Sequence, residues 1–114
     1  MENKRLCSIK VKQSVLFKQN KMDKEKRLYR AFLTLKSPKE VESFLKDLCT
    51  ASETKDFSDR LEIAVLLEDS ALSYREIAER TGASLTTVTR VAKFLKNPGN
   101  TGYKTVLKRL KKAK

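Results

Sequence analysis

The sequence predicts an all-α fold of six helices, and three observations support this prediction. Apolar residues recur at intervals of three and four, the period of an amphipathic helix, and no strand-like alternation persists. The chain of 114 residues contains only three glycines and two prolines, so few positions interrupt a helix. Ser, Thr or Asp residues stand where several helices should begin. At this length we expect one domain with a modest core, which a second copy could complete.

The first two helices are expected between residues 23 and 48. Asp23 is a suitable N-cap for a helix that ends at about Leu35. The apolar positions of this helix are Leu28, Phe32 and Leu35, with Tyr29 beside them. Ser37-Pro38 opens the second helix, because proline is tolerated in a first turn. The apolar stripe of the second helix comprises Val41, Phe44, Leu45 and Leu48.

Two longer segments flank the centre of the chain. A third helix is expected from Ser52 to Glu68, with inward candidates Phe57, Leu61, Ala64, Val65 and Leu67. A last helix should run from residue 101 or 102 to about Leu110 and bury Tyr103, Val106, Leu107 and Leu110. The stripes of the first, second and last helices exceed the needs of one small core. We therefore expect them to pack in a symmetric homodimer.

Residues 73–95 carry the pattern of a helix-turn-helix. Ser73 and Glu76 form a capping box that starts a short helix with Ile77 and Ala78 on its inner face. Gly82 should end this helix in the left-handed conformation, and Ser84 stands where a cap would start the next helix. Apolar residues of the second helix recur at Leu85, Val88, Val91, Ala92 and Leu95. Two short helices around a glycine turn are the arrangement of a DNA-binding motif.

The outer face of the second motif helix supplies the candidate DNA-binding residues. They are Ser84, Thr86, Thr87, Thr89, Arg90 and Lys93. Small hydroxyl residues allow a helix to enter the major groove, which is about 12 Å wide, and basic residues at its margins can bind phosphates. The alternative interpretation is a helical hairpin that binds no ligand.

The charge of the chain is concentrated at its two ends. The formal net charge is +12, and residues 1–22 and 104–114 each hold six basic residues, against one acidic residue in total. We interpret residues 1–22 as a basic flexible arm and residues 104–114 as a basic end, both suited to the phosphate backbone. The alternatives are solubilising tails or a weak contact with anionic membranes.

Several classes of function lack their usual sequence features. The chain has no histidine, no glycine-rich phosphate loop and no nucleophile beside a base, so we predict no enzyme, metal site or cofactor. Cys7 and Cys49 are too few for a disulfide framework and suggest a reducing compartment. There is no apolar run of 18 residues, and the first residues lack the apolar core of a signal peptide. We therefore expect a cytoplasmic protein without a membrane partner.

Four segments carry a resemblance to a known family. They are Leu-Cys-Thr (48–50), Ser-Asp-Arg-Leu-Glu-Ile (58–63), Leu-Ser-Tyr-Arg-Glu-Ile (72–77) and Gly-Ala-Ser-Leu-Thr-Thr-Val-Thr-Arg (82–90). Together they resemble the bacterial tryptophan repressor superfamily, most closely its YerC/YecD-type branch. The resemblance implies a Trp-repressor-like helical domain over residues 23–111 that forms an intertwined homodimer on operator DNA. It also implies that Arg75 contacts guanine and that Leu85, Thr86 and Thr89 contact bases.

The resemblance extends to part of an effector pocket. Thr50, Arg60 and Arg90 match family residues that hold an indole amino acid. Tryptophan-binding members have a glycine where this chain has Val91 and a serine where it has Phe94. Because the larger side chains would fill the space of a flat ring, we predict that tryptophan is not the co-repressor. We hypothesise that Phe94 replaces the ligand's ring and makes DNA binding constitutive; another small-molecule effector stays open.

These features together predict a sequence-specific DNA-binding transcriptional regulator of the bacterial nucleoid. We expect a repressor that binds a near-palindromic operator as a dimer, with Lys93 and the basic ends on phosphates. One alternative is a non-specific DNA- or RNA-binding protein in which the basic ends dominate. Another is a helical protein-interaction module.

Overall fold

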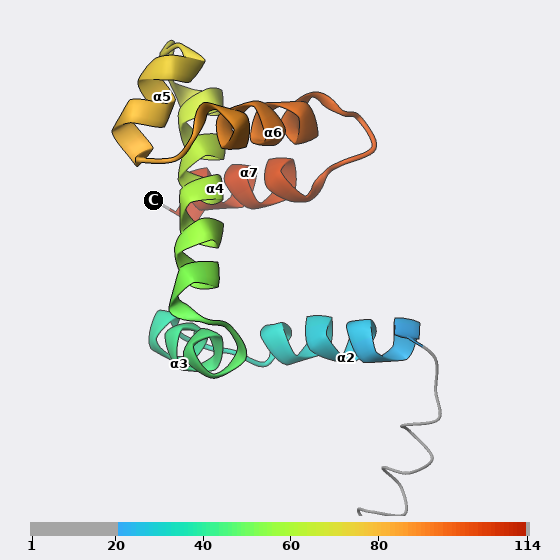
Figure 1. Ribbon diagram of the computed structural model, residues 1–114. Helices are drawn as coiled ribbons and strands as arrows, with labels where there is room; N and C mark the ends of the chain where they lie inside the picture. The colour runs from blue at the N-terminus through green and yellow to red at the C-terminus, as the bar shows by residue number, and fades with distance from the viewer. Residues whose placement is uncertain (1–20, 114) are drawn as a thin grey trace, which may run out of the picture. The chain divides into compact units, whose positions relative to one another are not determined.

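The chain folds as an all-α protein, as its sequence predicts. The structure, a computed structural model, describes residues 21–113; the predictions made for residues 1–20, most of the expected arm, lie outside this range. Its helices are α2 (Lys21–Leu33), α3 (Pro38–Leu48), α4 (Ala51–Asp69), α5 (Tyr74–Thr81), α6 (Leu85–Lys96) and α7 (Gly102–Ala113) (Figure 1). No strand occurs within residues 21–113. The chain divides into two compact units, residues up to Leu45 and residues from Lys46 onward.

The first unit contains α2 and most of α3. Helix α2 ends at Leu33, two residues before the predicted end, because Thr34 turns the chain: its hydroxyl donates to the Ala31 carbonyl at 2.7 Å. An edge-to-face contact between Phe32 and Phe44 joins the two helices, with ring centroids 5.2 Å apart. No residue of α3 is fully buried. These two helices therefore keep apolar side chains at their surface in a single copy.

Helix α4 begins one residue before the predicted Ser52. Thr50 is its N-cap, since the Thr50 hydroxyl accepts from the Glu53 amide at 3.1 Å and the Glu53 carboxylate accepts from the Thr50 amide at 2.9 Å. The C-terminal half of α4 supports the rest of the second unit. There α6 and α7 lie side by side and both cross α4, and α5 packs on α4 and α6 (Figure 1).

The core lies where α4, α5, α6 and α7 meet. Its buried apolar residues are Ile63, Ala64, Ile77, Val88, Val91, Ala92, Leu95 and Leu107. The predicted inner face of α4 was partly wrong, because Phe57 is 47% exposed and Leu61 is also exposed, whereas Ile63 is completely buried. Within the second unit, α5, α6 and α7 pack on the C-terminal half of α4, around Ile63 and Ala64. Leu85, which belongs to the apolar repeat of the second motif helix, is the first residue of α6 and is 47% exposed, so it lies outside the core.

Helix α7 extends through most of the basic C-terminal end. It continues to Ala113, beyond the predicted end at Leu110, so the basic residues between Lys104 and Lys112 stand on a regular helix. Only Leu107 of its apolar residues is buried; Val106 and Leu110, predicted to be inside, are exposed in the single chain. An ion pair of 2.8 Å between Lys111 and Asp69 ties the end of α7 to the end of α4.

Candidate nucleic-acid interface

The first helix of the motif, α5, is fixed by a complete capping box. The Ser73 hydroxyl accepts from the Glu76 amide at 3.1 Å, and the Glu76 carboxylate accepts from the Ser73 amide at 2.8 Å. The Ser73 backbone amide, with a further contribution from its hydroxyl, holds the pKa of the Glu76 carboxyl below its ordinary value. Arg75 is the second residue of α5 and is exposed. The predicted guanine-contacting side chain therefore projects from a well-defined helix start.

The turn between the motif helices adopts the predicted left-handed geometry. Gly82 has φ 78° and ψ 4°, and its amide donates to the Ala78 carbonyl at 2.9 Å. The Thr81 hydroxyl donates to the Ile77 carbonyl at 2.9 Å, and the Ala83 amide donates back to that hydroxyl at 3.3 Å. These bonds close the end of α5 and set the direction in which α6 begins.

Three of the predicted DNA-binding hydroxyls form hydrogen bonds within the first turns of α6. Ser84 is the N-cap, because its hydroxyl accepts from the Thr87 amide at 3.1 Å and lies 2.9 Å from the Thr87 hydroxyl. The Thr89 hydroxyl donates to the Leu85 carbonyl at 3.0 Å. Ser84 therefore acts first as the helix cap, the Thr87 hydroxyl is hydrogen-bonded to the Ser84 hydroxyl, and the Thr89 hydroxyl is bonded to its own helix.

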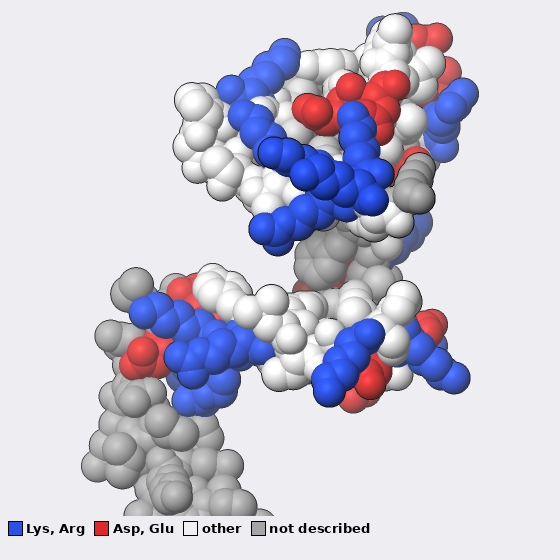
Figure 2. All heavy atoms as spheres, turned by 180° about the vertical axis from the view of Figure 1, so that it is seen from behind, with Lys and Arg blue, Asp and Glu red and all other residues white. Residues whose placement is uncertain are grey.

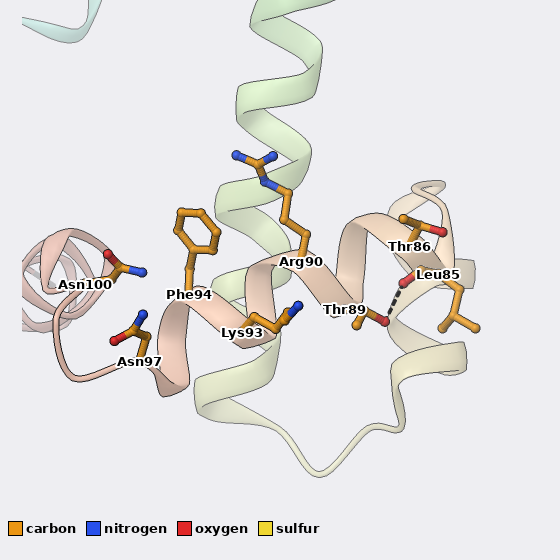
Figure 3. Close-up of a pocket in the computed structure, with 8 residues that line it drawn as sticks. All are labelled: Leu85, Thr86, Thr89, Arg90, Lys93, Phe94, Asn97 and Asn100. Atoms are coloured by element: carbon orange, nitrogen blue, oxygen red, sulfur yellow. Dashed lines mark hydrogen bonds between the residues drawn. The ribbon is translucent and has the colours of Figure 1, made fainter.

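The outer face of α6 forms a shallow hollow of about 570 Å³ (Figure 3). Its lining residues are Leu85, Thr86, Thr89, Arg90, Lys93, Phe94, Asn97 and Asn100. The first five belong to the predicted DNA-binding set, while Asn97 and Asn100 come from the loop after α6 and were not predicted. Buried Val88 and Val91 hold the opposite face of α6 in the core. The helix thus presents hydroxyl, apolar and cationic groups on one face, which are kinds of group able to contact base edges and phosphates.

Among the described residues of a single chain, the predicted effector residues Arg60 and Arg90 border two different hollows. The Arg90 guanidinium stacks on the Phe94 ring at 5.1 Å from its centroid, and both side chains project to the same side of α6 (Figure 3). Arg60 lies 5.9 Å from the Phe57 ring and borders a different hollow, near the motif turn. Thr50 caps α4 ten residues before Arg60, about 15 Å along the helix axis. Val91 is 1% exposed and belongs to the core.

One contact across the motif was not predicted from the sequence. The Lys96 ammonium donates to the Tyr74 hydroxyl at 3.1 Å and lies 5.8 Å from the centre of its ring. It joins the first residue of α5 to the last residue of α6. Local sequence patterns could not indicate this contact, since the two residues are separated by 22 positions.

Basic side chains are prominent on one face of the second unit. Figure 2 shows Lys and Arg side chains forming a broad band across the unit that contains α4–α7.

Within residues 21–113 there is no group of His, Cys, Asp and Glu side chains able to hold a metal ion. In the same range no helix has the length and apolar character needed to cross a membrane.

Comparisons with known proteins agree with this arrangement. Residues 23–111 match the family model of the Trp repressor protein. The chain is 39% identical to the uncharacterized protein YerC of Bacillus subtilis over 85 residues, which cover 75% of this chain and 80% of that protein. It is 40% identical over 78 residues to a Trp operon repressor homolog of Chlamydia trachomatis serovar D, covering 65% of this chain and 83% of the relative.

A solved structure gives the same result. The crystal structure of a TrpR-like protein from Eubacterium eligens superposes with a TM-score of 0.69 at 42% sequence identity, covering 75% of this chain and 86% of that one. The residues matched by the family model, 23–111, include the core of α4–α7 and the whole helix-turn-helix. The chain therefore belongs to the Trp repressor family.

Proposed function

We propose that this protein is a sequence-specific DNA-binding transcriptional regulator, and a repressor, that acts at the bacterial nucleoid in the cytoplasm. The observation that carries the proposal is the outer face of α6, which presents Thr86, Arg90 and Lys93 from a capped helix whose other face is buried. A helix held in this way has the form of a recognition helix in the major groove. Arg75 is the candidate for a bidentate contact with guanine.

The decisive experiment is selection of bound sequences from a random duplex pool at about physiological salt, where screening weakens contacts made by basic segments alone. Enrichment of a near-palindromic sequence supports the proposal. Binding without enrichment would favour a non-specific nucleic-acid-binding protein. Absence of any nucleic-acid binding would favour a protein-interaction module.

Arg75→Ala tests the assignment of specificity, with Arg80→Ala as its matched control. Both arginines are exposed on α5 and both substitutions remove one positive charge. Arg75→Ala should weaken binding to the selected duplex by about 1–3 kcal/mol and change binding to random duplex little. Arg80→Ala should leave the ratio of the two affinities unchanged. A uniform loss for Arg75→Ala would reassign that residue to the phosphate backbone.

We also propose that the regulator is a homodimer. The single chain exposes large apolar side chains on α2, α3, α4 and α7. Contiguous exposed apolar surface marks interaction sites, and a second copy of the chain would cover it. A two-fold dimer would bring two recognition helices to successive major grooves, about 34 Å apart. This spacing explains why the operator should be near-palindromic.

Phe57→Glu tests the dimer, because it introduces a charge into the apolar surface of α4. Leu85→Glu is the matched control, since Leu85 is equally exposed, at 47%, but lies on the outer face of α6. Sedimentation analysis should show a dimer for the native chain and for Leu85→Glu, and a monomer for Phe57→Glu. A monomeric native chain would contradict the proposal.

The contacts of Phe94 support regulation without tryptophan. Its ring lies against the Arg90 guanidinium, and the neighbouring Val91 fills the core where tryptophan-binding relatives are expected to have glycine. We expect tryptophan neither to raise the melting temperature nor to strengthen operator binding. A clear rise in either quantity on addition of tryptophan would show that Phe94 leaves room for the ligand.

A further inference from the structure

Helix α7 carries an unbalanced row of positive charge. Its basic residues are Lys104, Lys108, Arg109, Lys111 and Lys112, and it contains no acidic residue. Residues four apart lie on one side of a helix, so Lys104, Lys108 and Lys112 form a single row with a rise of about 6 Å per step. Thr105, Lys108, Arg109 and Lys112 line a hollow of about 360 Å³ beside this row.

Another side of α7 packs on the core. Leu107 is buried in the core, and Lys111 is paired with Asp69 at 2.8 Å. Lys111 is therefore paired with an acidic side chain. The other basic residues of α7, Lys104, Lys108, Arg109 and Lys112, are exposed. We call these four residues the α7 ridge. Because these residues stand on a regular helix that packs on the core through Leu107, the helix sets the spacing of their charges.

The stability of the helix does not account for the ridge. Helices α4 and α5 each begin with a Thr or Ser cap and a glutamate three residues later. Thr101 occupies the equivalent place in α7, since its carbonyl accepts from the Thr105 amide at 3.0 Å, but the residue three positions later is Lys104. A cation there opposes the helix dipole, and like charges four residues apart repel one another. An anionic ligand would remove this unfavourable balance.

We propose that the α7 ridge is a second, sequence-independent contact surface for the phosphate backbone of duplex DNA, separate from the helix-turn-helix. This inference rests on the proposed function, because it assigns the same ligand to a new site. A duplex carries one negative charge per about 1.7 Å of its length, so a row of cations about 12 Å long can bind several phosphates together. A membrane surface fits less well, because the central apolar residue of α7, Leu107, is committed to the core.

The test uses the full chain and two variants with equal changes of charge. Lys104→Gln/Lys108→Gln/Lys112→Gln removes the row from α7, and glutamine keeps a good helix-forming residue at each position. Lys24→Gln/Lys26→Gln/Arg27→Gln removes the same charge from exposed positions of α2. Far-UV circular dichroism first establishes that both variants keep native helicity. Affinity for a random-sequence duplex is then measured at several salt concentrations.

If the α7 ridge contacts phosphates, the affinity of the α7 variant for duplex DNA should depend less on salt than that of the native chain, and the α2 control should keep the native dependence. Each phosphate contact contributes about 0.9 to the slope of log affinity against log salt, so the α7 variant should have a slope shallower by about 2 to 3. The α2 control should change it by less than about 1. The ratio of selected to random duplex affinity should not fall in the α7 variant, because base contacts are retained.

Three results would overturn the assignment. Equal flattening in both variants would show that net charge, not the ridge, determines the slope. An unchanged slope in the α7 variant would show that the ridge does not touch the duplex. Loss of binding to phosphatidylserine vesicles in the α7 variant, with duplex binding intact, would assign the ridge to a membrane.

A different result would refute the proposed function and not the ridge. This result is a failure to select any sequence from the random pool while the difference in salt slope between the two variants is still present.

Discussion

Gly82→Ala should destabilise the protein by a predictable amount, because the structure isolates one cause. Gly82 has φ 78°, and an added Cβ atom would meet no atom within 4 Å. Steric overlap with neighbours therefore contributes nothing. What remains is the penalty for placing an L-residue in the left-handed conformation, about 1–2 kcal/mol. Gly82→Asn should lose less, because asparagine tolerates this conformation better than alanine.

Gly102→Ala is the matched control, with an expected effect of opposite sign. An added Cβ atom at Gly102 also meets no atom within 4 Å, but Gly82 is the one glycine with positive φ among residues 21–113. Gly102 is the first residue of α7, where alanine reduces the freedom of the unfolded chain. We expect a gain in stability of about 0.4–1 kcal/mol.

Urea denaturation followed by circular dichroism measures both effects. All variants must be compared at one protein concentration, because the stability of a dimer depends on concentration. Under conditions where every variant is folded, Gly82→Ala should also weaken duplex binding, since the turn sets the direction of α6. Equal stability of Gly82→Ala and the native chain, or an equal loss in Gly102→Ala, would refute the conformational argument.

Three further variants test the core, the ridge and the caps. Ile77→Ala removes a side chain with no exposed surface and should cost about 2–5 kcal/mol in urea denaturation. Lys104→Glu should complete a capping box with Thr101, raising the melting temperature at low salt while weakening duplex binding. Hydrogen bonds lower the pKa of Glu53 and Glu76 from 4.5, so their stabilising effect is present above that pH and is lost as pH falls through the lowered values. Replacing both with glutamine should therefore flatten the loss of stability on acidification, measured by thermal melting.

For each of these predictions we name a control or a result that would contradict it. Ile77→Val should cost only about 0.5–1.5 kcal/mol, and an equal cost for alanine would place Ile77 outside the core. Lys24→Glu on α2 changes the charge equally without completing a cap, so an equal rise in melting temperature would reject the cap. Unchanged acid sensitivity after both glutamine substitutions would mean that other carboxylates govern the acid response.

The helix-turn-helix could be predicted from the sequence because its determinants are local. Ser73 and Glu76 form their capping box within four residues, and Gly82 ends α5 through a preference of its own backbone. Ser84 caps α6 in the same way. The periodic valines Val88 and Val91 then fix which face of α6 is outside, and with it the candidate DNA-binding surface.

The candidate site was predicted less completely because it depends on neighbours distant in the sequence. The contact of Lys96 with Tyr74 and the part played by Asn97 and Asn100 in the hollow arise only after α6 has packed. The effector residues show a role that the sequence analysis did not include. Thr50, matched by resemblance to a ligand pocket, caps α4 with its hydroxyl in the single chain, and its pocket role stays a prediction.

The sequence by itself determined the helical class, the caps of α5 and α6 and the orientation of α6, since each follows from interactions within one turn of helix. Two other helix starts were predicted wrongly: α2 begins at Lys21, so Asp23 lies inside its first turn, and Thr50 caps α4, which begins before Ser52. Only the tertiary structure decided which residues of α4 are buried: Ile63 is inside and Phe57 is exposed, because α5, α6 and α7 pack against the C-terminal half of α4. It also decided that the basic end is an anchored helix, because the burial of Leu107 and the pairing of Lys111 with Asp69 depend on residues far away in the chain.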